Sequence, residues 1–419
     1  MSELSYMEKL LDGVEVEWKT LEDISIKISS GGTPKTGVSE FYDGDIPWLR
    51  TQEVNFCDIW DTEVKITESG VKNSSAKWIP KNCVIVAMYG ATVGKIGINK
   101  IPMTTNQACA NIQLNEEVAH YRYVFHFLCS QYTYIKSLGT GSQTNINAQI
   151  VKNIKIPIPC PDNPEKSLAI QSEIVRILDK FTAVTAELTA ELTAELNMRK
   201  KQYNYYRDQL LSFKEGEVEW KTLGEVAKIQ RGASPRPIVN YLTEQGNGIP
   251  WIKIGDTIPG SKYIDKTLQK ITAEGAQKSR ILNPGDFVIS NSMSFGRPYI
   301  LRITGAIHDG WASISNFGEK LNADYLYHYL SSKKVKNYWE SKINSGSVSN
   351  LNADIIKTLP VPLPDKQKQE RISALLDKFD TLTNSITEGL PREIELRQKQ
   401  YEYYRDLLFS FPKPDTVSN

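Results

Sequence analysis

The sequence predicts a mixed α/β protein in which two tandem domains are joined by long antiparallel coiled-coil helices, in a circular, pseudo-twofold arrangement. The first observation is that the chain is written twice: EVEWKTL stands at Glu15–Leu21 and again at Glu217–Leu223, and RKKQYNYYRDQLLSF (199–213) returns as RQKQYEYYRDLLFSF (397–411). The second is that short β-branched runs, bounded by Gly, Pro, Asn and Asp, are typical of strands. The third is a stretch without Gly or Pro, 166–214, which predicts one long helix.

Bulk composition limits the class of protein. A chain of 419 residues has room for two or three domains, and its net charge of +1 gives no global basicity that would point to nucleic acid. No apolar run approaches the roughly 20 residues of a membrane span, and the start, MSELSYMEKLLDG, is not a signal peptide. Five widely spaced cysteines without a C-x-x-C motif indicate a reduced, cytoplasmic protein.

The first expected element is a helix over 1–12. YMEKLLDGVEVEW (Tyr6–Trp18) resembles YRDQLLSFKEGEVEW (Tyr206–Trp220), so residues 1–12 are expected to be the end of a helix that completes the C-terminal copy. The two ends of the chain are therefore expected to be neighbours.

Two mixed α/β domains are expected next, over 13–165 and 215–365. Strands are expected at CVIVAMYG (Cys83–Gly90) and DFVISNS (Asp286–Ser292). Each domain then shows an aromatic helical segment and a strand that ends in alternating prolines, where we expect sheet pairing to stop. These segments are 121–138 and 323–339 for the helices, and Pro157, Pro159, Pro161, Pro360, Pro362 and Pro364 for the prolines.

A long central helix over 166–214 follows the first domain. Its apolar residues recur at steps of three and four, and its 49 residues would span roughly 74 Å, which is too long for the core of one domain. The helical region 366–411 supplies a partner, although Gly389 and Pro391 should break or kink it, and 412–419 form a tail. The residues expected to pack the helices and set their spacing are Leu188, Leu192, Leu196, Tyr203, Tyr206, Tyr401 and Tyr404.

Catalytic and metal-binding motifs are not found. GATVGK (Gly90–Lys95) resembles a phosphate-binding loop but is one residue short, and Ile96 stands where Ser or Thr would bind magnesium. The four histidines, His120, His126, His308 and His328, lack metal-ligand spacing and are expected to be ordinary packed or surface residues. We therefore expect no catalytic residue and no metal site.

Both domains carry loops rich in small, polar and basic residues. Glycine lets a backbone approach phosphate, Ser and Thr donate to phosphate oxygens, Asn and Gln can read adenine, and Arg can read guanine. A single loop of this kind is equally well a plain surface turn, but parallel sets that differ in their letters favour two DNA-reading surfaces. The candidate DNA-binding residues are Ser30, Gly31, Gly32, Thr33, Lys35, Tyr89, Thr92, Lys95, Asn106, Gln107, Ser142, Gln143 and Asn145 in the first domain, and Arg231, Ser234, Arg236, Asn291, Ser292, Ser294, Arg297, Ser347 and Asn350 in the second.

The charge of the domains limits how tightly they would hold DNA. Residues 217–365 contain 18 Lys and Arg against 14 Asp and Glu, a net charge of +4, and residues 15–162 contain 14 against 15, a net charge of −1. Neither domain resembles a basic arm that binds through counterion release. If DNA is the target, other subunits are expected to supply much of the phosphate contact.

The chain resembles the DNA-specificity subunits of type I restriction–modification systems. The resemblance rests on the duplicated first loop (GTP in copy one, ASP in copy two), the IPW strand, the Asn-rich segment before the proline strand and the two helical tails; the TAELTAELTAEL repeat (185–196) resembles that of one subgroup. It implies that each domain reads one half of a bipartite, asymmetric DNA site. It also implies that the helices set the spacer and dock two modification (methyltransferase) subunits. S-adenosylmethionine, ATP and Mg²⁺ would then bind to modification and restriction/motor subunits, and this cytoplasmic chain would carry no cofactor and no catalytic activity.

The TAEL word has a helical explanation. Four helical residues turn the chain by about 400°, a net of about 40°, and advance it by roughly 6 Å. One base pair of B-DNA turns by about 34–36° and rises by about 3.4 Å. The twists nearly match, although the rises do not, so one tetrad is a plausible step for moving one domain by about one base pair. A repeat without functional effect is the alternative.

Two other functions remain open from the residues alone. One is a degenerate methyltransferase-like protein, and the other is a scaffold that holds two identical partners on its helices without binding DNA. Methyl transfer by the lone chain would identify the former, and equal binding to specific and random duplexes the latter.

Overall fold

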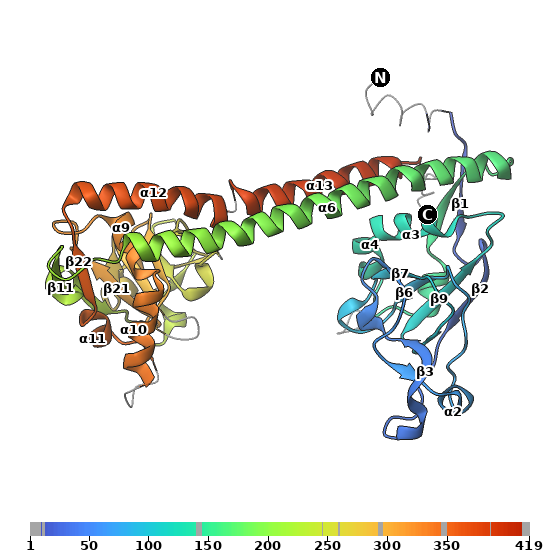
Figure 1. The fold of residues 1–419 in the computed structure, drawn as a ribbon, viewed down its shortest axis with the longest axis horizontal. Coiled ribbons are helices and arrows are strands. Elements are labelled where there is room, and N and C mark those ends of the chain that lie inside the picture. Colours follow the sequence, from blue (N-terminus) through green and yellow to red (C-terminus); the bar gives the residue numbers. More distant parts are fainter. Residues whose placement is uncertain are drawn as a thin grey trace. The chain divides into compact units, whose positions relative to one another are not determined.

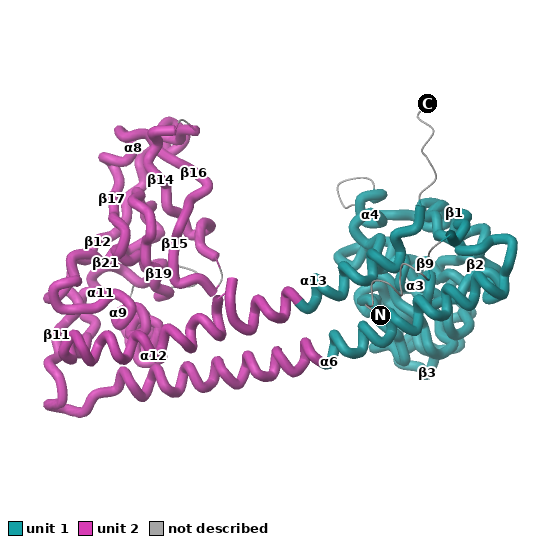
Figure 2. The backbone as a smooth tube through the Cα atoms, turned by 90° about the horizontal axis from the view of Figure 1, so that it is seen from above, with its two compact units in different colours: residues 1–187, 397–419 teal, residues 188–396 magenta. Residues whose placement is uncertain are grey.

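The computed structural model describes residues 10, 13–139, 145–244, 246–258, 260–291, 296–344, 350–385 and 387–412. The chain forms two compact units, of which one consists of residues 1–187 with 397–419 and the other of residues 188–396 (Figure 2). Each unit contains one of the two expected α/β domains. The expected N-terminal helix and the tail lie, apart from Leu10 and Pro412, outside the described residues.

The described part of the first unit contains a five-stranded sheet, a three-stranded sheet and a two-stranded sheet (Figure 1). A five-stranded mixed sheet has the order β2-β9-β6-β7-β4, with strands Ser25–Ser30, Cys109–Leu114, Val84–Ala87, Ile96–Asn99 and Cys57–Ile59. A three-stranded sheet has the order β5-β3-β8, with strands Lys65–Ile66, Tyr42–Leu49 and Thr104–Thr105. Its short helices are η1 Ser39–Phe41, η2 Thr51–Glu53, α2 Glu68–Lys72, η3 Gly90–Thr92, α3 Tyr121–Ser130, α4 Tyr132–Ser137 and α5 Ala148–Lys152.

The second unit repeats this topology. Its first sheet has the order β12-β21-β18-β19-β15, with strands Lys228–Arg231, Trp311–Ser315, Phe287–Ser290, Pro298–Leu301 and Tyr263–Ile264. Its other sheet has the order β13-β16-β14-β20-β17, with strands Leu242–Thr243, Gln269–Ile271, Ile249–Ile252, Gly305–Ile307 and Arg280–Leu282. Its short helices are α7 Leu223–Val226, η4 Ile238–Asn240, η5 Ile254–Asp256, α8 Ala273–Gln277, α9 Ala323–Leu330, α10 Lys333–Asn344 and α11 Ala353–Lys357.

The cores follow the alternation of side chains along the central strands. In β6, Val84 and Val86 pack in the same cluster as Tyr123 of α3, whereas Ile85 packs in a second cluster with Leu49 of β3. Successive side chains of a strand face opposite sides of the sheet, so one strand contributes to both clusters. The expected strands at 83–90 and 286–292 are confirmed as β6 and β18.

Two sequence expectations need correction. Each aromatic segment forms two helices, α3 and α4 or α9 and α10, and not one. The alternating prolines do not end sheet pairing, because Pro157 pairs with Trp18 and Pro159 with Val16 in a two-stranded antiparallel sheet of β1 Val16–Thr20 and β10 Lys155–Pro159. Because proline lacks an amide donor, the free edge of β10 cannot pair fully with a further strand. On that edge the carbonyl of Pro157 accepts a 2.7 Å bond from the hydroxyl of Tyr123. The second unit has the same sheet, β11 Glu219–Thr222 with β22 Pro360–Leu363.

The long helix α6 runs from Pro164 to Leu210. It begins two residues before the expected start, because Asn163 Oδ1 accepts a 3.0 Å bond from the amide of Lys166 and thereby caps the helix, with Pro164 in its first turn. The helix ends four residues before Lys214, and its first part belongs to the first unit and its second part to the other.

The expected break in the C-terminal helical region is confirmed. Helix α12 covers Lys366–Asn384 and helix α13 covers Leu390–Leu408. Between them Gly389 has a φ of +81°, and a Cβ at this position would lie 2.6 Å from the carbonyl oxygen of Thr381. Glycine is therefore required both by the left-handed conformation and by the close approach of the backbone. Pro391 lies in the first turn of α13, where its missing amide hydrogen is tolerated.

Each unit is completed by a tail helix from the other copy of the repeat. In the first unit the ring of Phe181 on α6 stacks on Tyr404 of α13, with ring centres 5.4 Å apart. In the second unit the ring of Phe379 on α12 stacks on Tyr206 of α6, with ring centres 5.7 Å apart. These pairs occupy the same places in the repeat, since Phe379 and Tyr404 stand 198 residues after Phe181 and Tyr206.

The ends of both tails enter the cores of the units on which they lie. Leu408 and Phe409 are buried in the core of the first unit, and the indole of Trp18 donates a 2.8 Å bond to the carbonyl of Pro412. Leu10 packs against the same core. In the second unit Leu211, the counterpart of Phe409, is buried in the corresponding core. This exchange of tails is the circular arrangement that the sequence predicts.

Among the residues that the structure describes, no helix is both long and apolar enough to cross a lipid bilayer.

Candidate nucleic-acid interface

Three backbone hydrogen bonds join the candidate loops of the first unit. The amide of Gly32 donates to the carbonyl of Thr105 at 2.9 Å. The amide of Met88 donates to the carbonyl of Ala108 at 2.8 Å, and the amide of Ile146 donates to the carbonyl of Met88 at 3.0 Å. Segments far apart in the sequence, around residues 30–36, 89–95, 104–107 and 145, therefore meet in one cluster, which we call the first loop cluster.

The glycines of this cluster have a different role from the one expected. Gly31 and Gly32 are buried, and a Cβ at Gly31 would lie 1.9 Å from the carbonyl oxygen of Thr105. The indole of Trp48 donates a 2.9 Å bond to the carbonyl of Gly32. Glycine is thus required because two loops pack tightly, and the two residues do not expose backbone to phosphate.

The side chains of the first loop cluster divide into structural and exposed groups. The hydroxyl of Thr92 donates to the carbonyl of Thr51 at 2.8 Å, and Asn106 Oδ1 accepts a 3.1 Å bond from the amide of Ala108. Both side chains therefore hold the loops in shape, whereas Lys95 Nζ donates to Asn55 Oδ1 at 2.9 Å on an exposed surface. The other exposed side chains of this cluster are Ser30, Thr33, Lys35, Tyr89 and Gln107.

Gln107 has a defined partner. The hydroxyl of Thr33 donates to Gln107 Oε1, so the first loop and the loop after β8 are joined by their side chains as well as by their backbones. Lys35 lies two residues further along the first loop and is exposed.

The second unit has the same three backbone bonds at equivalent positions. The amide of Ala233 donates to the carbonyl of Ile307 at 3.2 Å, that of Asn291 to Gly310 at 3.0 Å, and that of Leu351 to Asn291 at 3.2 Å. They define a second loop cluster, which brings together residues around 231–236, 291, 297, 308–310 and 350. The two clusters have the same backbone frame and different exposed side chains.

His308 and Asp309 belong to the second loop cluster but were not among the DNA-binding candidates of the sequence. β8 is parallel to β3, with Thr104 opposite Trp48, and β20 is parallel to β14, with Ala306 opposite Trp251. This register makes His308 and Asp309 the counterparts of Asn106 and Gln107. Residues 104–107 (TTNQ) and 306–309 (AIHD) have no residue in common. Their equivalence is visible only from the parallel pairing of each segment with the IPW strand of its unit.

Asp309 is the centre of a polar network in the second loop cluster. Its Oδ1 accepts a 2.8 Å bond from the hydroxyl of Ser234, and its Oδ2 accepts a 3.2 Å bond from Nη2 of Arg236. The hydroxyl of Ser234 lowers the pKa of Asp309, and Arg236 adds to this effect against the opposing influence of burial. Burial lowers the pKa of His308. At neutral pH the cluster therefore holds an ionised carboxylate beside a neutral imidazole.

The remaining candidates, apart from Arg297, fall into three groups. Arg231 donates from Nε to the carbonyl of Asp309 at 3.5 Å, and Asn291 donates from Nδ2 to the same carbonyl at 3.3 Å. Asn145 and Asn350 stand immediately before Ile146 and Leu351, whose amides join the loops. Outside the described residues lie Ser142, Gln143, Ser292, Ser294 and Ser347.

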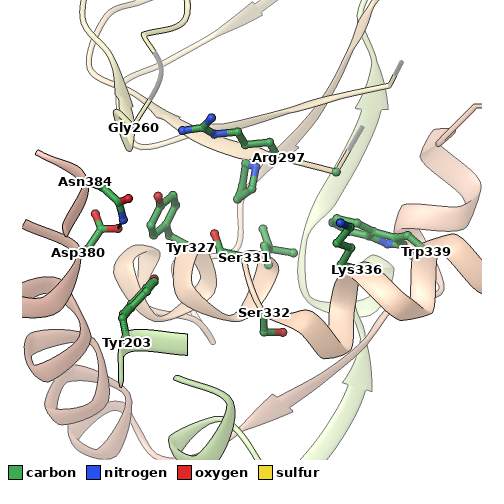
Figure 3. Close-up of a pocket in the computed structure, with 13 residues that line it drawn as sticks. Tyr203, Gly260, Arg297, Tyr327, Ser331, Ser332, Lys336, Trp339, Asp380 and Asn384 are labelled. Atoms are coloured by element: carbon green, nitrogen blue, oxygen red, sulfur yellow. Dashed lines mark hydrogen bonds between the residues drawn. The ribbon is translucent and has the colours of Figure 1, made fainter. Parts of the chain in front are cut away.

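Arg297 is exposed beside a pocket of the second unit (Figure 3). Its guanidinium lies 5.2 Å from the centre of the Tyr299 ring. The pocket has a volume of about 390 Å³, and its polar lining includes Arg297, Lys336, Asp380 and Asn384. Burial raises the pKa of Asp380, although Asn384 donates a 2.9 Å bond to its carboxylate.

Two of the histidines are buried parts of the frame. His126 of α3 lies 2.8 Å from Asp179 of α6, and His328 of α9 lies 2.7 Å from Asp377 of α12. No group of three or more His, Cys, Asp and Glu within the described parts of the chain could hold a metal ion.

Comparison with known proteins gives a consistent result. The family model described as "Type I restriction modification DNA specificity domain" matches residues 13–198 and 215–396. The chain is 42% identical over 425 residues to the type I restriction enzyme EcoR124I/EcoR124II specificity subunit of Escherichia coli, with 100% of both chains covered. It is 38% identical over 408 residues to the EcoprrI specificity subunit of the same species, with 93% of both covered.

Solved structures share the fold. A chain from a study of complex assembly and conformational transition in the type I R-M system superposes with a TM-score of 0.68 at 19% identity, covering 95% of this chain and 98% of the other. The HsdS subunit from Thermoanaerobacter tengcongensis superposes with a TM-score of 0.50 at 18% identity, covering 94% of this chain and 95% of the other.

Proposed function

Because the chain belongs to the type I restriction–modification DNA specificity family, we propose that it is the non-catalytic subunit that selects the DNA sequence for a modification and restriction complex. The first loop cluster contacts one half of a bipartite, asymmetric site and the second loop cluster contacts the other half. One observation carries this assignment: the same three backbone hydrogen bonds hold both clusters, while the exposed side chains differ. A common frame with different surface groups is what a reader of two different half-sites needs.

The duplicated tails are proposed to dock two copies of one modification (methyltransferase) subunit. Tyr205 and Tyr403 occupy equivalent places in the two YYRD segments and are 62% and 60% exposed. Exposed aromatic residues are enriched where proteins meet, and two identical surfaces suit two identical partners. Restriction/motor subunits would join this assembly.

Cofactors are proposed to belong to the partner subunits. S-adenosylmethionine would bind to the modification subunits, and ATP and Mg²⁺ to the restriction/motor subunits. The partners also need to supply much of the grip on phosphate, because the domains have net charges of only −1 and +4. The complex would act in the cytoplasm, where its DNA substrate lies, and the TAEL repeat would place the chain in the subgroup with a variable central repeat.

Exchange of one domain tests this function. Replacing residues 217–365 with the corresponding domain of another specificity subunit should change one half of the methylated site and leave the other half as it was. The measurement is genome-wide mapping of methylated bases in cells that express the whole complex. A change in both halves would contradict independent reading, and methylation without sequence preference would contradict the function itself.

A further inference from the structure

We propose that each loop cluster contains a three-residue reading set, Thr33, Lys35 and Gln107 in the first unit and Ser234, Arg236 and Asp309 in the second. In the second set Arg236, held by Asp309, reads guanine. In the first set Gln107, held by Thr33, reads adenine. The inference rests on the proposed function, because it names the residues and bases through which the two clusters select DNA.

The equivalence of the two sets follows from backbone geometry. Gly32 and Ala233 make the same bond to the strand that runs parallel to the IPW strand, so Thr33 corresponds to Ser234 and Lys35 to Arg236. The parallel pairing of β8 with β3 and of β20 with β14 makes Gln107 and Asp309 equivalent positions of the repeat. In both units a hydroxyl of the first loop then donates to the side chain that follows the parallel strand. The geometry is the same, although all three residue types differ.

The chemistry of the second set suits guanine. A carboxylate at a DNA interface repels phosphate unless it is neutralised, and Asp309 is bonded by both Ser234 and Arg236. The pair is not a buried structural ion pair, because the side chain of Arg236 is 83% exposed and that of Asp309 is 39% exposed. A guanidinium has five N–H donors in a planar fork, so the bond through Nη2 fixes its orientation and leaves donors to face outward. Guanine presents two acceptors, O6 and N7, to such a fork in the major groove.

The chemistry of the first set suits adenine. The Thr33 hydroxyl donates to Gln107 Oε1, which leaves the second lone pair of that oxygen and the amide N–H groups to face outward. A carboxamide pairs with the N6 donor and the N7 acceptor of adenine. Thr33 and Gln107 are both exposed. The reading side chains therefore differ: the Arg236 guanidinium presents only donors, and the Gln107 carboxamide presents donors and an acceptor.

The test uses the assembled modification complex with the full chain. Methylated sites are mapped for the wild type, R236K, D309N and Q107A, and the matched control is R302K. Arg302 is in the same unit, where its guanidinium lies 3.6 Å from the centre of the Tyr263 ring and pairs with Asp265. Circular dichroism of each purified complex confirms that it is folded.

The expected result is local relaxation. R236K and D309N should each relax one G·C position of one half-site, and Q107A one A·T position of the other, with discrimination at that position reduced roughly 5- to 150-fold. R302K should give the wild-type site. Lysine retains the charge of Arg236 but lacks its planar fork, so R236K should leave a phosphate contact in place and should weaken a bidentate contact to guanine.

Three results would overturn the reading sets. The first is an unchanged wild-type site in R236K and D309N. The second is an equal decline of methylation at every sequence, and the third is relaxation at an A·T pair in R236K. Should a complex lose methylation altogether, equilibrium binding to duplexes that vary at each position replaces the mapping, with the same expected pattern. Failure of the proposed function looks different, because the wild-type complex itself would then lack a bipartite sequence preference.

Discussion

At the scale of single residues, each unit has one cation that pairs with two carboxylates, but the cation comes from a different element in each unit. In the first unit Arg122 of α3 pairs with Asp179 of α6 at 2.9 Å and with Asp58 of β4 at 3.0 Å. In the second unit the cation is Lys262, beside β15, and it pairs with Asp377 of α12 at 2.7 Å and Asp324 of α9 at 2.5 Å. The carboxylate at this place in the repeat is retained in both units, as Asp179 on α6 and as Asp377 on α12, whereas the other two charges have changed places.

The anchor of the first unit predicts a dependence of stability on pH. Burial works to raise the pKa of Asp179, but hydrogen bonds from His126 and Arg122 outweigh it and lower the pKa to about 2. Because this value lies below the unfolded value of 3.8, the charged carboxylate favours folding above about pH 4, and this contribution is lost as the pH falls towards 2. The shift corresponds to roughly 2.5 kcal/mol for a buried group, and screening of a side chain that is 36% exposed reduces it to about 1 kcal/mol.

The D179N variant measures this contribution. Its free energy of unfolding in denaturant should lie about 1 kcal/mol below that of the wild type at pH 7 and should equal it near pH 2. The exposed D265N variant, at a surface pair, provides the control and should show no such change with pH. An equal deficit of D179N at both pH values would show that the charge of Asp179 is not responsible.

Residues also mark the limit of prediction from sequence. Thr33, Lys35 and Gln107 could be proposed as DNA-binding residues from the sequence alone, because they lie in loops rich in small, polar and basic residues. Asp309 could not, because its counterpart is a glutamine and their equivalence depends on the pairing of β14 with β20, 55 residues apart at Trp251 and Ala306. The structural role of Gly31 was equally hidden, since it depends on contact with Thr105.

At the scale of elements, local chemistry decides most of what is predictable. The 47 residues of α6 contain no glycine, and its one proline stands at the first position, so the long helix follows from composition. The break before α13 follows from Gly389 and Pro391. Each aromatic segment divides into two helices, and the prolines of β10 pair with β1. Both features depend on contacts with other elements, which the periodicity of the local sequence does not predict.

The TAEL repeat gives a prediction for α6. Residues 185–196 span the position where the helix passes from the first unit to the second, and Leu188, Leu192 and Leu196 are half-buried. Deleting Thr193–Leu196 should shorten the recognised spacer by about one base pair and leave both half-sites unchanged, because four residues turn a helix by about 400°, one full turn and about 40° more, which is close to the twist of one base pair. Methylation mapping provides the measurement.

A two-residue deletion provides the contrast. Removing Thr193 and Ala194 turns the following helix by about 200°, so methylation at bipartite sites should be lost. Altered half-site sequences in the four-residue variant would show that the repeat influences reading and not spacing.

At the scale of the whole molecule, neither unit is made from one continuous stretch of one repeat. The first unit takes residues 397–419 from the second copy, and the second takes residues 188–210 from the first copy. The fold class could be predicted because the duplication preserves its landmarks at offsets near 200 residues. The likeness of residues 6–18 to 206–220 predicts that residues 1–12 complete the C-terminal copy and that the two ends of the chain are neighbours; residues 1–9, 11 and 12 lie outside the described residues.

The exchange predicts where core substitutions act. Phe409 is 7% exposed, and its ring centre lies 5.5 Å from that of Tyr123 and 5.4 Å from that of Phe127. F409A should destabilise the first unit by about 3 kcal/mol through the cavity that it leaves. L211A, at the equivalent position, should destabilise the second unit by a similar amount.

Hydrogen exchange locates these effects. F409A should reduce amide protection in β6 and β9 while β18 and β21 keep theirs, and L211A should do the reverse. Loss of protection in the second unit of F409A would contradict the assignment of the tail to the first unit.

The tail that seals the first unit also sets an order of events at the ribosome. Residues 188–396 are contiguous, so the second unit has all its parts before synthesis ends. The first unit, although translated earlier, lacks part of its core until Leu408 and Phe409 have been added. A polypeptide that stops before Leu408 therefore carries an incomplete amino-terminal unit beside a second unit that has all its parts.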